Sequence, residues 1–197
     1  MESISEKNYI NEHIKKSINV KELIINDDKL IEGIDDVAKL CVEAFKRGNK
    51  VILAGNGGSA ADAQHIAAEF VSRFRFNRPG LPSISLSTDT SMITAIANDY
   101  GYKNLFSRQL EANGKSGDIF IGITTSGNSE NIINAFKYCT KNSITSIGFL
   151  GSSGGEAKNE VDFPLCIPND ETAFIQESHI MLGHIICGYV ETTIFSK

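Results

Sequence analysis

The chain has 197 residues, of which 41% are hydrophobic, and its 19 Lys and Arg residues against 24 Asp and Glu residues give a formal net charge of −5. This length fits one domain, since domains commonly have roughly 100–200 residues, and the apolar content is sufficient for a packed core, which excludes a disordered chain. The acidic balance, without a run of Lys and Arg, argues against a nucleic-acid-binding protein.

The first quarter of the chain has helical spacing. Apolar residues recur every four positions within residues 3–25, which is typical of an amphipathic helix. A second such pattern, at residues 30–45, ends at Gly48. We therefore expect an N-terminal helical arm, residues 1–47, ahead of an α/β core, residues 48–197.

From residue 50 onward, short apolar segments alternate with amphipathic ones. The strongest apolar segments are continuous runs, typical of strands buried on both faces. The alternation predicts βαβ units with right-handed crossovers, and hence an α/β fold with a parallel sheet. Strands are expected at residues 50–54, 83–86, 118–123, 144–150 and 163–167, and helices at 60–71, 91–97, 104–112, 131–141 and 171–195.

The cysteines and the N-terminus indicate the compartment. No two cysteines form a C-x-x-C pair, so neither a zinc knuckle nor a redox motif is present. Their apolar neighbours predict small, buried hydrophobic side chains at Cys41, Cys139, Cys166 and Cys187. The polar N-terminus lacks the apolar stretch of a secretory signal, and no segment is apolar enough to span a membrane, so we expect a cytoplasmic protein.

Three loops that follow predicted strands are rich in Gly, Ser, Thr and Asn, at residues 55–59, 124–129 and 151–155. At the carboxyl ends of parallel strands, such loops can direct backbone N–H groups at an anion, and the next helix adds its partial positive charge. The first loop, GNGGS, is compatible with either a tight turn or phosphate binding. The second, TTSGNS, has four hydroxyl groups around one glycine, which favours phosphate binding. Such a site needs no Lys or Arg, so the net acidity is compatible with a phosphorylated substrate.

Two helices contain side chains suited to catalysis or metal binding. His65 and Glu69 are four residues apart and share one helix face. They could bind one metal ion or exchange a proton, although a solvated His–Glu pair is the commoner arrangement. Gln176 and His184 lie broadly on one side of the closing helix, two turns apart, and His184 alone would also fit as a packed histidine. His179 points elsewhere, which predicts a structural role.

Together, these segments resemble the sugar isomerase (SIS) domain family and, within it, the phosphoheptose isomerases. The resemblance extends over essentially the whole chain. The T-x-S-G-x-S loop is found in SIS domains in general, whereas the set H-x-x-x-E, N-D-[FY]-G and Q-E-x-H-x-x-x-x-H is much narrower. The matching segments are GNGGSAADAQHIAAEF (55–70), RFRFNRPGLPSISLS (73–87), IANDYGY (96–102), FSRQLEA (106–112), TTSGNS (124–129) and IQESHIMLGH (175–184).

The resemblance implies a single SIS domain over residues 1–197, with a three-layer, flavodoxin-like parallel sheet and helices on both faces. It implies an isomerase that converts sedoheptulose 7-phosphate to D-glycero-D-manno-heptose 7-phosphate through an enediol. That reaction would be the first step of ADP- or GDP-heptose synthesis for lipopolysaccharide core or capsule. The resemblance further implies a cytoplasmic homotetramer with one Zn²⁺ per subunit.

The site residues implied by the resemblance fall into three groups. The catalytic residues are Glu69 as the base and His184 as the acid. The metal ligands are His65, Glu69, Gln176 and His184. The substrate contacts are Asn56, Gly57, Gly58, Ser59, Glu69, Arg73, Asn98, Asp99, Thr124, Thr125, Ser126, Ser129 and Gln176.

Two positions depart from the family pattern. Thr124 stands where Ser is commoner, and the hydroxyl group is kept. Phe174 stands where a charged residue, often Arg, is usual, so a polar contact near the site entrance is not expected here.

The main alternative is a non-catalytic SIS protein that binds the bacterial replication initiator. Such a protein would have no reason to keep the complete set of metal-ligand positions. Arabinose-5-phosphate isomerases, N-acetylmuramate phosphate etherases and sugar-phosphate-sensing regulators are longer or have further domains, so the length disfavours them. Because the ligands come from distant helices of one small domain, we expect subunit association to complete the pocket.

Overall fold

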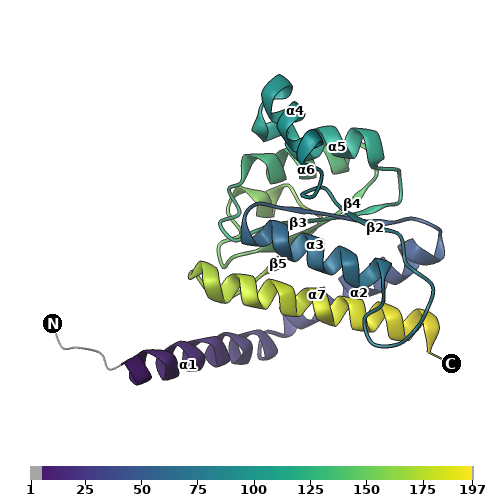
Figure 1. Ribbon diagram of the computed structural model, residues 1–197. Helices are drawn as coiled ribbons and strands as arrows, with labels where there is room; N and C mark the ends of the chain where they lie inside the picture. The colour runs from purple at the N-terminus through teal and green to yellow at the C-terminus, as the bar shows by residue number, and fades with distance from the viewer. Residues whose placement is uncertain (1–5, 197) are drawn as a thin grey trace.

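The computed structural model describes residues 6–196, with side chains from residue 8 onward. The first predicted helix is observed as α1, Glu6–Ile25; residues 3–5 of that prediction lie outside the described residues. Within the predicted N-terminal arm, α1 projects from the body, whereas α2 (Asp28–Lys46) packs on the sheet (Figure 1). The Asp27 carboxylate accepts a 3.1 Å hydrogen bond from the Leu30 N–H and so fixes the start of α2.

A five-stranded parallel sheet forms the centre of the molecule, in the order β2-β1-β3-β4-β5. This is the strand order of a flavodoxin-like fold and confirms the predicted α/β class. Every residue of β1 and β3 is buried, as the apolar runs predict. The strands are β1 (Val51–Gly55), β2 (Ser83–Ser85), β3 (Ile119–Thr124), β4 (Thr145–Leu150) and β5 (Phe163–Cys166).

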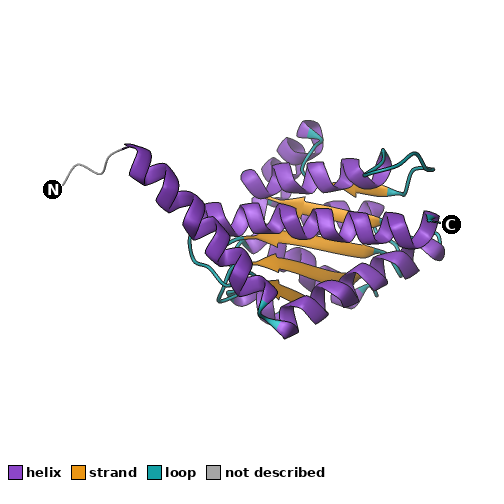
Figure 2. Ribbon diagram, turned by 90° about the horizontal axis from the view of Figure 1, so that it is seen from below, coloured by secondary structure: helices purple, strands orange, loops and turns teal. Residues whose placement is uncertain are grey.

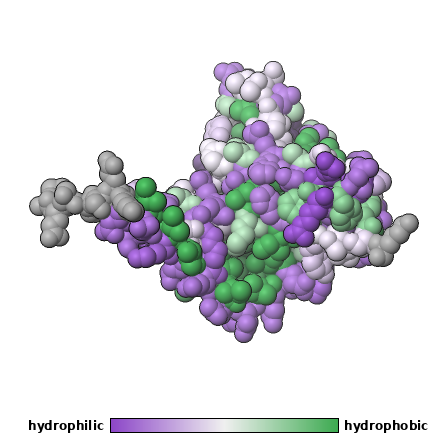
Figure 3. Space-filling model, turned by 60° about the horizontal axis from the view of Figure 1, so that its bottom comes forward, coloured by the Kyte–Doolittle hydropathy of each residue, from purple (hydrophilic) through white to green (hydrophobic). Residues whose placement is uncertain are grey.

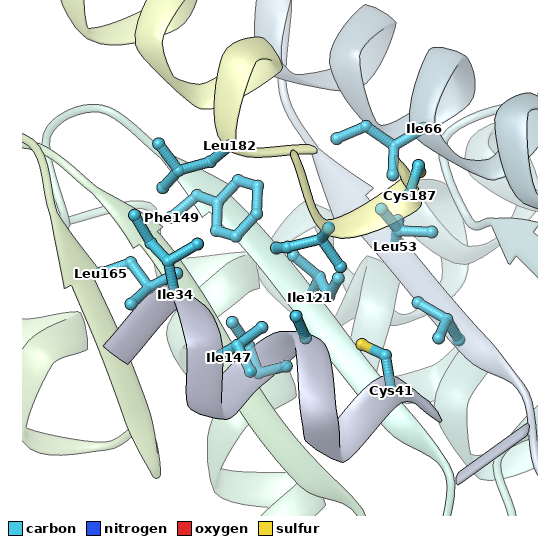
Figure 4. Close-up of a cluster of buried hydrophobic side chains, with 14 of the residues drawn as sticks. Ile34, Cys41, Leu53, Ile66, Ile121, Ile147, Phe149, Leu165, Leu182 and Cys187 are labelled. Carbon is cyan, nitrogen blue, oxygen red and sulfur yellow. The ribbon is translucent and has the colours of Figure 1, made fainter. Parts of the chain in front are cut away.

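Helices cover both faces of the sheet (Figures 1 and 2). One face packs against α2, α3 (Gly58–Val71) and α7 (Thr172–Phe195), and the other against α5 (Leu105–Asn113) and α6 (Glu130–Lys141). Because side chains alternate along a strand, Leu53 and Ile121 belong to the first cluster, and Phe120 to the second. Figure 4 shows Ile121 near the centre of the first cluster and Leu53 beside Cys187 of α7.

The predicted helix and strand boundaries agree with the structure to within three residues over the described chain. Two short 3₁₀ helices, Tyr102–Asn104 and Glu156–Asn159, were not predicted, because single turns are too short to show a period. The remaining helix, α4 (Thr90–Tyr100), has no buried residue and projects from the top of the molecule (Figure 1).

Three of the four cysteines, Cys41, Cys139 and Cys187, are buried as predicted, and Cys166 is half-buried because β5 is an edge strand. Burial raises the pKa of the Cys41 thiol to about 12, which disfavours a nucleophilic role. Within residues 6–196, no helix combines the length and the apolar character needed to cross a membrane.

Candidate active site

The sheet has its topological switch point between β1 and β3. From β1 the chain passes to β2 on one side, and it then returns to β3 on the other. Ligands of open α/β sheets bind at the carboxyl ends of the strands at such a point. The loops of residues 55–59 and 124–129 lie here, which is where the fold favours ligand binding.

Hydroxyl groups converge in the loop after β3. The Thr124 Oγ1 lies 3.0 Å from Ser129 Oγ and 3.5 Å from Ser126 Oγ, and Thr125 is half-buried beside them. Ser129 is the N-cap residue of α6, yet its side chain makes no capping hydrogen bond. The hydroxyls therefore stand at a helix N-terminus, where backbone N–H groups and the helix dipole favour an anion.

The third glycine-rich loop, residues 151–155, packs against the loop of residues 124–129. Gly127 has φ of +68°, and a Cβ added to it would lie 2.1 Å from Gly154 O, so only glycine allows the two backbones to approach. The Ala157 N–H donates to Gly127 O over 2.9 Å, and the Glu156 N–H donates to Asn128 Oδ1 over 3.1 Å. The structure thus assigns residues 151–155 a packing role beside residues 124–129, the hydroxyl loop.

The loop after β1 is joined to this site by Asn56. Its side-chain amide pairs with that of Asn131 at the start of α6, and its Oδ1 also accepts from the Tyr102 hydroxyl at 2.8 Å. Gly57, with φ of +56°, forms the N-cap of α3, and Ser59 is 4% exposed. Neither Asn131 nor Tyr102 was predicted from the sequence, because only the fold brings them to Asn56.

A second cluster lies on the outer surface, between α3 and α7. His65 Nε2 is 3.1 Å from Glu69 Oε1 and 3.4 Å from His184 Nε2. The three possible ligand atoms all lie within 4.8 Å of one another. His65 is 50% exposed, which leaves one side of the cluster open. Two imidazole nitrogens and one carboxylate with an open side form the donor set of a catalytic zinc site, so these residues fit the predicted metal.

Gln176, the fourth predicted ligand, lies at the other end of α3 within this chain. A Cβ added to Gly58 would be 2.7 Å from Gln176 Nε2, so the Gln176 amide packs against Gly58. Gly58 precedes His65 by seven residues, which is roughly 10 Å along a helix. The structure therefore brings three of the four predicted ligands together and places Gln176 beside the loop after β1.

Asp62 lies one turn before His65 in α3 and was not predicted. Its Oδ2 is buried and has no hydrogen-bond partner among the described residues. Burial raises the pKa of Asp62 to about 6, against the opposing charge of His65. An unpartnered buried carboxylate oxygen beside the cluster is a further reason to expect a cation there. The i, i+3 spacing of Asp62 and His65 was the available sequence signal.

The remaining predicted substrate contacts are exposed. Arg73 lies in the turn after α3. Asn98 and Asp99 lie on α4, where the Asn98 amide donates to Asp99 Oδ1 over 2.8 Å. These side chains lie at the molecular surface, free to contact a ligand or a second subunit.

Two other aromatic residues of α7 belong to the packing. Phe174, where the family usually has a charged residue, is 1% exposed, and its ring centroid lies 4.7 Å from that of His13 in α1. His179 is fully buried, and its Nε2 is 3.1 Å from Leu150 O, so the predicted structural role agrees with its position.

The hydroxyl loop, residues 124–129, lies at the carboxyl edge of the sheet, whereas the cluster of His65, Glu69 and His184 lies further along α3. Gly58 adjoins the loops at the carboxyl edge of the sheet, whereas Glu69 comes 11 residues later, which is roughly 16 Å along α3. Beside the cluster, a pocket of about 340 Å³ opens between His184, Phe74 and Glu177. Along α3, the rise from Gly58 is thus roughly 10 Å to His65 and roughly 16 Å to Glu69.

Comparisons with known proteins show the family. A model described as "SIS domain" matches residues 14–151. The phosphoheptose isomerase of Aneurinibacillus thermoaerophilus is 59% identical over 187 residues, which cover 95% of this chain and 94% of that protein. The phosphoheptose isomerase of Clostridium acetobutylicum is 56% identical and covers 97% of both chains. A solved phosphoheptose isomerase from Francisella tularensis is 36% identical, with a TM-score of 0.91 over 95% of this chain and 99% of that one.

Proposed function

The chain belongs to the SIS domain family and, within it, to the phosphoheptose isomerases, and from this premise we propose that it converts sedoheptulose 7-phosphate to D-glycero-D-manno-heptose 7-phosphate. It is a sugar phosphate isomerase, and the proposal concerns its substrate and product. The main support is the cluster of His65, Glu69 and His184, in a chain that also has a hydroxyl-lined loop at its switch point. The relatives reported above are named as enzymes, which favours catalysis over the initiator-binding alternative.

The phosphate group is proposed to bind at residues 124–129. The hydroxyls of Thr124, Ser126 and Ser129 can donate to its oxygens, and the N-terminus of α6 supplies N–H groups and partial positive charge. No cationic side chain is required. This accounts for how a chain with a net charge of −5 binds a phosphate monoester.

A metal ion, proposed to be Zn²⁺, would be held by His65, Glu69 and His184, with Gln176 as a predicted further ligand. When bound, it would polarise substrate oxygens as a Lewis acid. The half-exposed cluster leaves room for the substrate on its open side. One ion per subunit is expected, because each chain has one such set among its described residues.

Glu69 and His184 are proposed to move the protons. Glu69 removes a proton from C1 while His184 donates one to the oxygen on C2, which gives the neutral enediol. Glu69 then returns its proton to C2, and His184 accepts the proton of the C1 hydroxyl, which leaves an aldehyde at C1. The second carboxylate oxygen of Glu69 is available for this transfer while Oε1 faces His65.

We further propose a homotetramer in which neighbouring subunits complete each site. Within one chain, Gly58 and the predicted ligand Gln176 lie roughly 10 Å along α3 from His65 and roughly 16 Å from Glu69, so a neighbouring subunit has room to contribute to the site. A stripe of exposed apolar residues on α1 supports association: Tyr9 is 64% exposed, Ile10 57%, Ile14 51% and Ile18 54% (Figure 3). The predicted cytoplasmic location and the supply of heptose for lipopolysaccharide or capsule belong to the same proposal.

The decisive experiment uses the purified full-length protein with its metal content measured. It is incubated with sedoheptulose 7-phosphate, and the product is followed by proton NMR. The aldose product has a hydrogen on its anomeric carbon, which the ketose lacks, so its signal reports conversion directly. Deuterium incorporation at C2 in D₂O would indicate exchange at the enediol stage. No product from zinc-replete protein would contradict the proposal and restore the non-catalytic alternative.

A further inference from the structure

A buried ion pair joins the turn after α3 to α7. Arg78 Nε donates to Glu191 Oε1 over 3.1 Å, and the two side chains are 2% and 1% exposed. They are separated by 113 residues in the sequence. Neither belongs to the predicted site. A buried pair of this kind gives little net stability compared with well-packed apolar residues.

Glu191 uses its carboxylate to hold the turn. Oε1 accepts from the Phe74 N–H at 2.8 Å, and Oε2 accepts from the Arg75 N–H at 2.7 Å. Burial acts to raise the pKa of Glu191, but these two N–H groups and the Arg78 guanidinium hold it below its usual range. Glu191 is therefore ionised at neutral pH and fixes the backbone of residues 74 and 75 against α7.

Arg78 holds the end of α3. Its Nη2 donates to Glu69 O over 2.8 Å, and its Nη1 donates to Phe70 O over 2.6 Å. These carbonyls belong to the last turn of the helix, where no intrahelical partner exists. The planar guanidinium thereby connects the backbone of Glu69 to the carboxylate of Glu191.

The same pair also acts on His184. The Phe74 ring, whose N–H is held by Glu191, lies 5.5 Å from the His184 ring between centroids. Glu191 follows His184 by seven residues in α7, which is two helical turns. Arg78 and Glu191 thus hold Glu69 through its own backbone and His184 through Phe74.

We propose that Arg78 and Glu191 are positioning residues of the candidate metal centre, which set the spacing of Glu69 and His184 and with it the affinity for the metal. This inference rests on the proposed function only in taking the cluster as a metal site. Metal ligands must be held closely in place, and loss of an outer-shell partner lowers metal affinity by about 10- to 100-fold.

The chain contains a matched control, because Asp118 has the same chemistry away from the cluster. Asp118 is 1% exposed and accepts from the N–H groups of Lys50 and Lys115 and from the Lys50 ammonium group. It directly precedes β3, at the amino edge of the sheet. Glu191→Gln and Asp118→Asn therefore remove the same charge and weaken the same kind of hydrogen bonds.

The test measures zinc affinity of the metal-free, full-length proteins by competition with a chromophoric chelator, together with their thermal unfolding without metal. We expect both variants to unfold at lower temperature and only Glu191→Gln to weaken zinc binding, by about 10- to 100-fold. Arg78→Lys, which keeps the charge but loses the planar fork, should lie between Glu191→Gln and the parent protein. If Glu191→Gln does not fold, Arg78→Lys serves as the test variant in its place.

Unchanged zinc affinity in the folded variants, or equal weakening by Asp118→Asn, would overturn the inference. So would a parent protein that binds no zinc. A parent protein that binds zinc but does not isomerise the heptose phosphate contradicts the proposed function instead, and the affinity comparison still decides this inference.

Discussion

The side-chain amides of Asn56 and Asn131 hydrogen bond to each other in both directions, over 3.0 and 2.9 Å, although 75 residues separate them. Asn56 follows β1 and Asn131 lies in the first turn of α6 after β3, so the pair spans the switch point of the sheet. Asn131 is 3% exposed. The buried Asn131 therefore fixes the orientation of the more accessible Asn56 side chain.

Replacement of Asn131 should misplace Asn56. Asn131→Ala is expected to destabilise the fold by about 1–3 kcal/mol, because the amide of Asn56 loses its partner, and to raise KM several-fold. Steady-state kinetics and urea unfolding measure the two effects. Asn134→Ala, one turn further along α6, removes a hydrogen bond to Lys103 O and serves as the control. An equal rise of KM in both variants would argue against a special role for the Asn56 pair.

The hydroxyl loop should control affinity for the phosphate group. Ser129→Ala removes one of the converging hydroxyls, which makes no capping hydrogen bond to α6. We expect about a 10-fold rise in KM with less change in kcat, since a hydrogen bond to a charged group contributes about 1.5–3 kcal/mol. Inhibition by inorganic phosphate should weaken in parallel. Ser107→Ala, on α5, is the control, and a KM unchanged by Ser129→Ala would exclude phosphate binding by this hydroxyl.

Glu69 should be essential for proton transfer. Glu69→Gln removes the base but keeps the size of the side chain, and kcat should fall by about 10²- to 10⁴-fold. Circular dichroism and analytical ultracentrifugation should show an intact fold and assembly. Glu111→Gln, which disrupts an exposed ion pair with Arg108, is the charge-matched control. Turnover retained by Glu69→Gln would rule out its assignment as the base.

His179 should make stability depend on pH. Burial lowers its pKa to about 4, so the folded protein keeps it neutral while the unfolded chain takes up a proton near pH 6.5. Stability should therefore fall as the pH decreases from 6.5 to 4, by up to about 3 kcal/mol.

Urea unfolding of metal-free protein across this pH range tests the expectation, because metal binding depends on pH and would otherwise add its own change in stability. His179→Gln keeps an N–H donor for Leu150 O and should flatten the profile, whereas His13→Gln, at an exposed position, should not. An unchanged slope in His179→Gln would contradict the assignment.

The apolar stripe of α1 should be needed for assembly. Ile14 is 51% exposed on α1, and Ile14→Glu would place a charge in the proposed interface. Sedimentation velocity should show smaller species, with reduced turnover if neighbouring subunits complete the site. Lys15→Glu, at a polar position of the same helix, is the control. A variant that keeps the parent's mass would exclude this stripe as an interface.

The sequence predicted features that depend on near neighbours in the chain. Apolar runs and helical periods predicted the elements to within three residues, because burial of one face imposes a period on the side chains. The His65–Glu69 contact followed from four-residue spacing alone. The three glycine- and hydroxyl-rich loops lie at the carboxyl ends of β1, β3 and β4, as the predicted order of strands and loops indicates.

Contacts between distant segments were decided only by the tertiary structure. His184 meets His65 because α7 packs closely on α3 at Gly183, where an added Cβ would lie 2.4 Å from the Ile66 side chain. Gln176, on the same helix, instead lies beside Gly58. Helical spacing fixes how residues are placed around one helix, but the register between two helices depends on how their surfaces pack.

The same reason explains why Arg78 and Glu191 were not predicted. Arg78 and Glu191 form no pattern with their near neighbours in the sequence, and 113 residues separate the two. By itself, the sequence determined the class of fold, the family and the chemical groups available for catalysis. The tertiary structure decided which of those groups meet and which buried residues hold them, because long-range side-chain packing is set by the complete fold.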